Sequence, residues 1–91
     1  MNNPAHPGAV LRDMLPMTVG AFAAHIGVSR NTLSRILNEH AAVTPEMSIK
    51  FAEAFGQPTL SIWFQMQNNY DFWKASQKKR RKISKFERKG K

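Results

Sequence analysis

Apolar residues recur three and four positions apart through most of residues 7–74, and short connectors separate the runs. This is the period of amphipathic helices, and no alternation of useful length indicates strands. Helix start and stop signals divide the region into five short segments. Pro7 is suited to open the first and Pro16 ends it, whereas Thr18 can cap the second and Gly27 can close it in a left-handed conformation. The pattern predicts an all-α domain.

The third segment, within the stretch GVSRNTLSRILNE, separates into two faces. Ser29 is a good N-cap, so we expect a helix from Arg30 to about Asn38. Its apolar residues, spaced three and four apart, form one stripe that holds the helix against the body: Leu33, Ile36 and Leu37. The polar residues left facing outward near the N-terminal end are Arg30, Asn31, Ser34 and Arg35.

These four side chains are of the kinds that recognise base edges in DNA. Arginine can donate two parallel hydrogen bonds to guanine in the major groove, asparagine can pair with adenine in the same way, and serine adds a shorter contact. Residues 27–29 supply a tight turn between two helices, which is the arrangement of a helix-turn-helix. Exposed polar residues on a short helix are most often only solvated, but the turn and the surrounding motifs favour contact with double-stranded DNA.

The last two segments repeat the helix signals and add large aromatic side chains. Thr44 and Pro45 form a cap and first-turn pair, and Phe51 and Phe55 mark a buried stripe in the fourth segment. In the fifth segment five residues at spacings of three and four form one broad face: Trp63, Met66, Gln67, Tyr70 and Trp73. This face either packs into the core, as so small a domain requires, or forms the seam of a dimer.

The net charge of +8 is concentrated at the C-terminus. Residues 1–73 hold four basic and five acidic side chains, a net of 4 − 5 = −1, and residues 74–91 hold ten basic and one acidic, a net of 10 − 1 = +9. We expect residues 75–91 to form a flexible basic tail that is either only solvated or a phosphate-binding arm. An arginine-rich segment that binds RNA, with Phe86, is a third alternative. The arm would consist of Lys78, Lys79, Arg80, Arg81 and Lys82.

What the chain lacks also limits its function. Cysteine is absent, and His6, His25 and His40 are too far apart in sequence for a local ligand pair. With no catalytic constellation to pair with them, we predict no enzyme, no metal site and no cofactor. No apolar run approaches the roughly 20 residues of a membrane span, and the N-terminus MNNPAHPG lacks the parts of a secretion signal. We expect a bacterial protein that is cytoplasmic and does not bind membranes.

Four motifs occur in a specific order and spacing. They are HPG at 6–8, FAAHIGVSRNTLSRILNE at 22–39, VTPEMSIKFAEAFG at 43–56 and W-x-x-M-Q-x-x-Y-D at 63–71. On these motifs, residues 6–73 resemble the HigA group of antitoxins within the Xre family of helix-turn-helix repressors. The resemblance implies a five-helix domain like that of λ repressor over residues 6–74, following a flexible N-terminus at 1–5 and preceding the basic tail.

The same resemblance implies partners and further contacts. It implies a homodimer that binds operator DNA near its own gene, represses that operon and neutralises a HigB-like toxin, a small ribosome-dependent mRNA endonuclease. Two alternatives stay open: a stand-alone Xre-family transcriptional regulator without a toxin, and a toxin-binding module whose contact with DNA is incidental. Phosphate contacts within the domain are assigned to Thr18, Ser29, Thr32 and Asn38.

Overall fold

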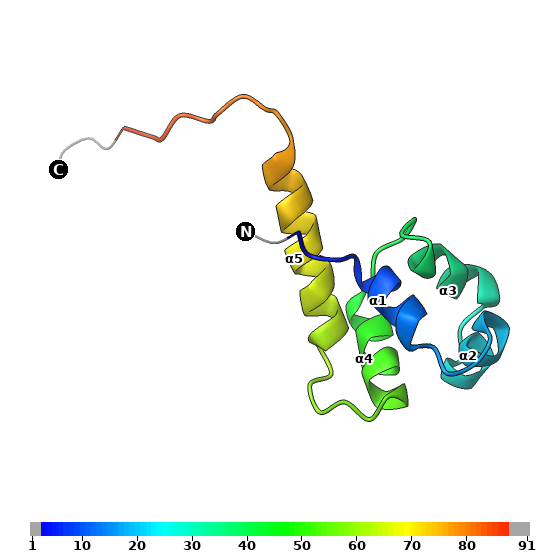
Figure 1. The fold of residues 1–91 in the computed structure, drawn as a ribbon. Coiled ribbons are helices and arrows are strands. Elements are labelled where there is room, and N and C mark those ends of the chain that lie inside the picture. The colour runs from blue at the N-terminus through cyan, green and yellow to red at the C-terminus, as the bar shows by residue number, and fades with distance from the viewer. Residues whose placement is uncertain (1–2, 88–91) are drawn as a thin grey trace.

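The computed structural model describes residues 3–87, and residues 1–2 of the expected flexible N-terminus and 88–91 of the expected tail lie outside it. The described chain holds five helices and no strand, which confirms the predicted all-α class (Figure 1). Within this range no helix is both long enough and apolar enough to cross a membrane. The helices are α1 (Pro7–Met14), α2 (Val19–Ile26), α3 (Arg30–Leu37), α4 (Pro45–Ala54) and α5 (Ile62–Gln77).

The predicted caps are confirmed. The hydroxyl oxygens of Thr18, Ser29 and Thr44 each accept from the backbone N–H three residues on, at 3.2, 3.0 and 3.2 Å. Each bond satisfies one of the donors that the start of a helix leaves without a partner. Gly27 ends α2 with φ of 77°, in the left-handed region that a residue without a Cβ adopts at little cost. Local sequence therefore decides where these helices begin and end.

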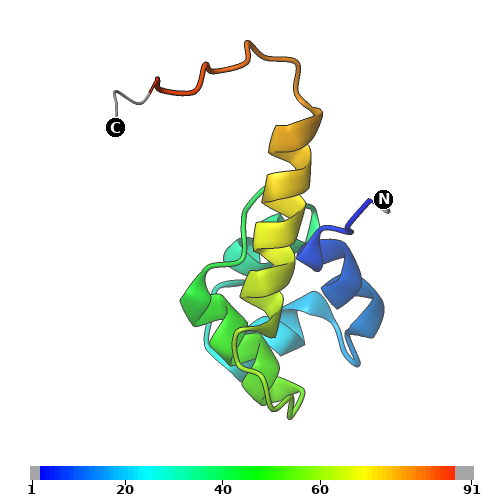
Figure 2. The same ribbon diagram turned by 90° about the vertical axis from the view of Figure 1, so that its left-hand side faces the viewer.

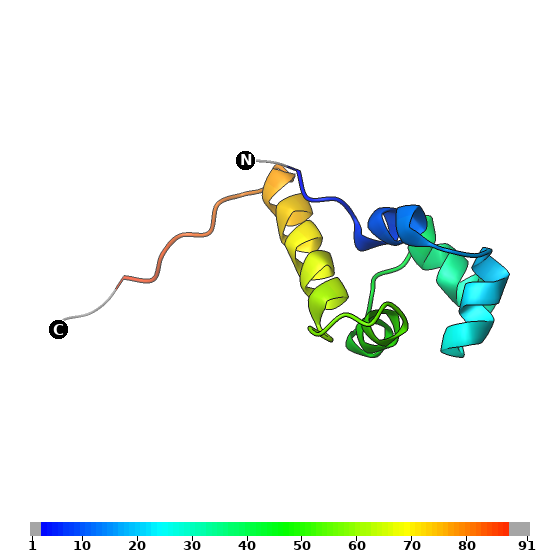
Figure 3. The ribbon, with the colours of Figure 1, turned by 60° about the horizontal axis from the view of Figure 1, so that its bottom comes forward.

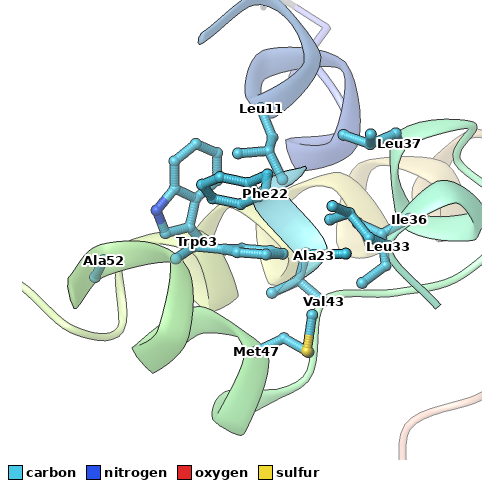
Figure 4. Close-up of a cluster of buried hydrophobic side chains, with 11 residues drawn as sticks. Leu11, Phe22, Ala23, Leu33, Ile36, Leu37, Val43, Met47, Ala52 and Trp63 are labelled. Atoms are coloured by element: carbon cyan, nitrogen blue, oxygen red, sulfur yellow. The ribbon is translucent and has the colours of Figure 1, made fainter. Parts of the chain in front are cut away.

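The core lies where all five helices meet. Figure 4 shows Leu11 of α1, Phe22 of α2 and Trp63 of α5 directed toward one another, with Leu33 and Ile36 of α3 beside them. The predicted apolar stripe of α3 is buried, as are the aromatic side chains of Phe22, Phe51 and Trp63. Burial of a side chain of this size contributes about 1.5–3 kcal/mol. The buried apolar residues are Leu11, Phe22, Ala23, Leu33, Ile36, Leu37, Val43, Met47, Phe51, Ala52 and Trp63.

Helix α5 is held by buried polar contacts along its first half. Gln67, only 3% exposed, accepts from the backbone N–H of Val43 at 2.8 Å and donates to Asp71 at 2.9 Å. Ser48 of α4, also buried, accepts from the backbone N–H of Phe64 at 3.0 Å. Two of the five residues that the sequence placed on one broad face of this helix, Trp63 and Gln67, therefore lie in the core. The other three, Met66, Tyr70 and Trp73, are half-buried, so a dimer seam there stays a prediction.

The second half of α5 projects beyond the body of the domain (Figure 2). The helix continues to Gln77, three residues into the range 75–91 that the sequence assigned to the tail. Phe72, on this half, is 75% exposed. Beyond Lys78 the described chain is neither helix nor strand. Helix α3 lies on the other side of α1 and α4 from α5, so the body separates the two helices (Figure 3).

Two residues of the HPG motif have structural roles that periodicity does not predict. His6, 5% exposed, caps α1 because its Nδ1 accepts from the backbone N–H of Gly8 at 2.9 Å, and its ring meets the Tyr70 ring edge-on at 4.9 Å between centroids. Gly8 lies against α3, where an added Cβ would come within 1.9 Å of the Ile36 carbonyl oxygen. Only glycine lets α1 approach α3 this closely.

The His6 cap makes stability depend on pH. Burial lowers the pKa of His6 below its ordinary value of 6.5, against the opposing effect of Glu39 and Asp71, and only the neutral ring can accept from Gly8. As pH falls below 6.5, the unfolded chain binds a proton that the folded chain does not, so stability present above 6.5 is lost. We expect the melting temperature to fall between pH 7.5 and 5.5, measured by circular dichroism. A His6→Asn variant, which can cap through its amide oxygen, should show a smaller decline; an equal decline would contradict the assignment.

Candidate nucleic-acid interface

The connection from α2 to α3 is a rigid turn of three residues. The backbone N–H of Gly27 bonds to the Ala24 carbonyl at 3.3 Å, and that of Val28 bonds to the Ala23 carbonyl at 3.0 Å. Ser29 then caps α3, and Val28 packs against the core. Because each residue of the turn is held by a backbone bond, a cap or the core, the orientation of α3 relative to α2 is fixed by local contacts.

The exposed side of α3 carries the residues that the sequence assigned to base contact. Successive residues of an α-helix are about 100° apart, which places these four on an arc opposite the buried stripe. Arg30, Asn31 and Arg35 are exposed and Ser34 is half-buried. The structure therefore brings all four together on one polar surface, whose contact with DNA stays a prediction.

The two arginine side chains of this surface are held in place by different contacts. The stem of Arg30 passes over Gly20 of α2, where an added Cβ would lie 3.6 Å from its Cδ atom. Arg35 points toward the loop after α3, because its guanidinium donates to the backbone carbonyl of His40 at 3.1 Å. That bond is exposed, so solvent or a ligand competes for it at little cost. Arg30 is thus placed by packing and Arg35 by an exchangeable hydrogen bond.

The residues assigned to phosphate contact are mostly engaged within the protein. Thr18 accepts from its helix and keeps its hydroxyl proton free to donate. Ser29 both accepts from the Thr32 backbone and donates to the Thr32 hydroxyl oxygen at 2.8 Å, so its bonding capacity is largely used by the cap. Thr32 keeps its own proton. Thr18 and Thr32 therefore remain able to donate to a phosphate, whereas Ser29 serves mainly to start α3.

The side chain of Asn38 forms hydrogen bonds with one residue of α1 and one of α3. Its amide oxygen accepts from the Arg12 guanidinium of α1, and its amide nitrogen donates to the Ser34 hydroxyl oxygen at 3.3 Å. The pair Ser34 and Asn38 is one helical turn apart, a spacing that sequence reveals. Arg12 is separated from Asn38 by 26 positions, and no periodicity signals that contact. Arg12 of α1 therefore extends the polar surface that α3 presents.

Comparison with known proteins identifies the architecture. The family model described as Helix-turn-helix matches residues 11–62. The chain belongs to the helix-turn-helix family. It is also similar to Virulence-associated protein A of Dichelobacter nodosus, with 34% identity over 74 residues that cover 77% of this chain and 72% of the relative.

Solved structures similar to this chain include antitoxins of the HigA type. An addiction module antidote protein of the HigA family from Coxiella burnetii is 29% identical, with 81% of this chain and 84% of that chain covered and a TM-score of 0.76. The Pseudomonas aeruginosa antitoxin HigA, solved with the higBA promoter, is also 29% identical, with 79% and 82% covered and a TM-score of 0.73. The resemblance to HigA-type antitoxins of the Xre family is confirmed.

The described part of the basic tail of this helix-turn-helix protein, up to residue 87, lies away from α3. Its five assigned residues follow the end of α5, on the side of the domain away from α3 (Figure 1), and all are exposed: Lys78, Lys79, Arg80, Arg81 and Lys82. An extended chain covers about 3.3 Å per residue, so the tail is long enough to meet a ligand well outside the domain. Whether that ligand is DNA stays a prediction.

The three histidines are not all in one place. His6, the buried cap of α1, and the exposed His40 line one open cavity together with Glu39 and Asp71, whereas His25 is exposed on α2. His25 lines an open cavity of about 280 Å³ between α2 and α4 with Lys50 and Glu53. Within residues 3–87 no group of three His, Asp or Glu side chains is arranged to hold a metal ion.

Proposed function

We propose that this protein is the antitoxin of a type II toxin–antitoxin system, which binds operator DNA as a homodimer, represses its own operon and neutralises a HigB-like mRNA endonuclease. The observation that carries the proposal is the surface of α3. A capped helix within a helix-turn-helix presents two arginines, an asparagine and a serine on the side opposite its buried stripe. These are the side chains that best match major-groove base edges.

Recognition would begin with insertion of α3 into the major groove, N-terminal end first. Arg30, unengaged by any hydrogen bond within the described chain, is available for bidentate donation to guanine, and Asn31 for adenine. Thr18 and Thr32 would donate to flanking phosphates and fix the register. The similar antitoxin from Pseudomonas aeruginosa, solved with its promoter, supports this mode of binding.

Dimerisation is proposed through the projecting half of α5. Phe72 is 75% exposed there, and the rings of Tyr70 and Trp73, whose centroids lie 6.3 Å apart on the same half of the helix, are half-buried. Aromatic side chains left in water on a projecting helix are suited to an interface, because their burial contributes both area and ring contacts. In such a dimer the two copies of α3 would meet half-sites about 34 Å apart.

The tail is proposed as a phosphate-binding arm. Its lysines and arginines would neutralise phosphates near the operator without regard to base sequence. The domain up to residue 73 carries a net charge of −1, so most of the general attraction to DNA would come from the tail. Base selection by α3 and attraction by the tail are thus separable by mutation.

Neutralisation of a toxin is supported by the likeness to the addiction module antidote protein of the HigA family. The proposal requires a small open reading frame for the toxin directly beside this one. Co-expression of the two chains should give a stable complex on size-exclusion chromatography and relieve the growth arrest that the toxin causes. Absence of any such neighbour would leave a stand-alone transcriptional regulator as the function.

The Arg30→Ala variant tests operator recognition. We expect it to lose about 1–3 kcal/mol of affinity for DNA from upstream of its own gene, because one bidentate base contact disappears, with preference relaxed at a single base pair. Fluorescence anisotropy against operator and shuffled DNA of equal length measures both effects. Lys74→Ala removes the same charge from α5, away from α3, and should lower both affinities slightly and equally. Unchanged specific affinity in Arg30→Ala would refute the assignment of α3.

A further inference from the structure

We propose that Arg12 of α1 is a positioning residue for operator recognition: through Asn38, it fixes Ser34 as a hydrogen-bond donor toward DNA. The inference rests on the proposed function, namely that α3 contacts base edges. It deepens that function by stating which base chemistry Ser34 selects and which residue outside α2 and α3 decides it. The observation is the chain of two hydrogen bonds from Arg12 to Asn38 and from Asn38 to Ser34.

The close approach of α1 and α3 places Arg12 over the C-terminal half of α3. Gly8 lies against the Ile36 carbonyl, and Arg12 follows one helical turn later on the same side of α1. Its side chain is exposed and reaches the Asn38 amide oxygen. The contact is thus set by the packing of two helices and not by the turn that joins α2 to α3.

The chemistry of the three groups fixes the direction of both hydrogen bonds. A guanidinium has five N–H donors and no acceptor, so only the amide oxygen of Asn38 can face Arg12. The amide nitrogen then faces Ser34 and donates to its hydroxyl oxygen, at 3.3 Å. Without the guanidinium, the amide could turn over and accept from Ser34 instead. Arg12 therefore decides which of the two arrangements is populated.

The consequence is a defined polarity at Ser34. The bond from Asn38 occupies one of the two lone pairs of the Ser34 oxygen on the protein side, which leaves the hydroxyl proton free to donate to a base. Guanine N7 and O6, adenine N7 and thymine O4 accept in the major groove, whereas the cytosine amino group donates. Ser34 should therefore favour a base edge that presents an acceptor and disfavour the cytosine amino group at the position it faces.

A double-mutant cycle on the full chain tests the proposal. Binding of wild type, Arg12→Met, Asn38→Ala and the double variant is measured against operator, shuffled DNA and every single-base change of the operator. The base pair that faces Ser34 is the one at which Ser34→Ala loses discrimination. Arg12 and Asn38 are exposed and Ser34 is half-buried, and the melting temperature of each variant is measured to check that it is folded.

If Arg12 acts through Asn38, Arg12→Met should reduce discrimination at that base pair about 3- to 10-fold, the equivalent of one hydrogen bond. The same change should have no further effect on discrimination in the Asn38→Ala background. Equal losses in both backgrounds would mean that Arg12 contacts DNA by itself and would overturn the proposal. So would a uniform loss on operator and shuffled DNA with a salt slope lower by about one, which marks a phosphate contact.

Asn38→Asp supplies a readout that a purely structural role would not change. A carboxylate still accepts from Arg12 but has no donor for Ser34, so the Ser34 proton turns inward and its lone pairs face DNA. We expect the preference at that base pair to shift toward the cytosine amino group, after division by the general loss seen with shuffled DNA. An unchanged preference overturns the inference alone. A wild-type chain that does not distinguish operator from shuffled DNA overturns the proposed function and this inference together.

Discussion

Replacement of Gly8 by alanine is expected to destabilise the domain by about 3 kcal/mol, the upper part of the usual range for overpacked sites. The added Cβ would come within 1.9 Å of the Ile36 carbonyl oxygen, and a backbone oxygen cannot move aside by rotating a side chain. Relief requires α1 to move away from α3. A chain of this size has only about 5–14 kcal/mol of total stability, so the loss should be plain in urea denaturation.

Gly20→Ala is the matched control for this prediction. It makes the same substitution near the start of α2, where the new Cβ would meet only the Arg30 stem at an ordinary 3.6 Å. Alanine also favours a helix by about 0.5–1 kcal/mol over glycine, so this variant should be unchanged or more stable. Equal stability of the two variants would show that the approach of α1 to α3 does not restrict residue 8.

Neutralisation of the tail is expected to have the largest effect on DNA binding. Changing Lys78, Lys79, Arg80, Arg81 and Lys82 to glutamine removes five potential phosphate contacts. Each contact contributes about 0.9 to the slope of log affinity against log salt, so the slope should fall by about 4 to 5. At low salt this corresponds to a loss of about 100-fold or more for operator and shuffled DNA alike, and titration at several salt concentrations measures it.

Base preference separates the tail from α3 in that experiment. Because phosphate contacts position a protein without selecting sequence, the ratio of operator to shuffled affinity should be nearly the same in the tail variant and wild type. Arg30→Ala should do the opposite, reducing the ratio while leaving most of the salt slope. A tail variant with an unchanged slope would mean that the tail is only solvated.

Features of the fold that depend on neighbours in the chain agree with their prediction from the sequence. A cap bonds to a backbone N–H three residues on, so Thr18, Ser29 and Thr44 could be assigned from local pattern alone. The buried and exposed faces of α3 follow from the helical period, and Leu33 and Ile36 lie in the core as predicted. The same period places the polar residues of α3 on one outer face, without reference to any tertiary contact.

Contacts between helices distant in sequence could not be predicted in this way. The edge-on contact of His6 with Tyr70 requires α5 to pass beside the start of α1, which no local pattern indicates. The length of α5 beyond residue 74 was also missed, because polar and small residues at its end obscure the apolar period. The half-buried state of Trp73 lies between the two alternatives that the sequence left open.

By itself, the sequence determined five helices, their caps, the turn at Gly27 and the outward polar surface of α3, because each depends on residues within a few positions of one another. Only the tertiary structure decided that Gly8 must be glycine, that Gln67 satisfies the backbone of Val43, and that Arg12 reaches Asn38. These contacts join residues 24 to 28 positions apart, and their geometry arises from how the helices cross. No local periodicity carries that information.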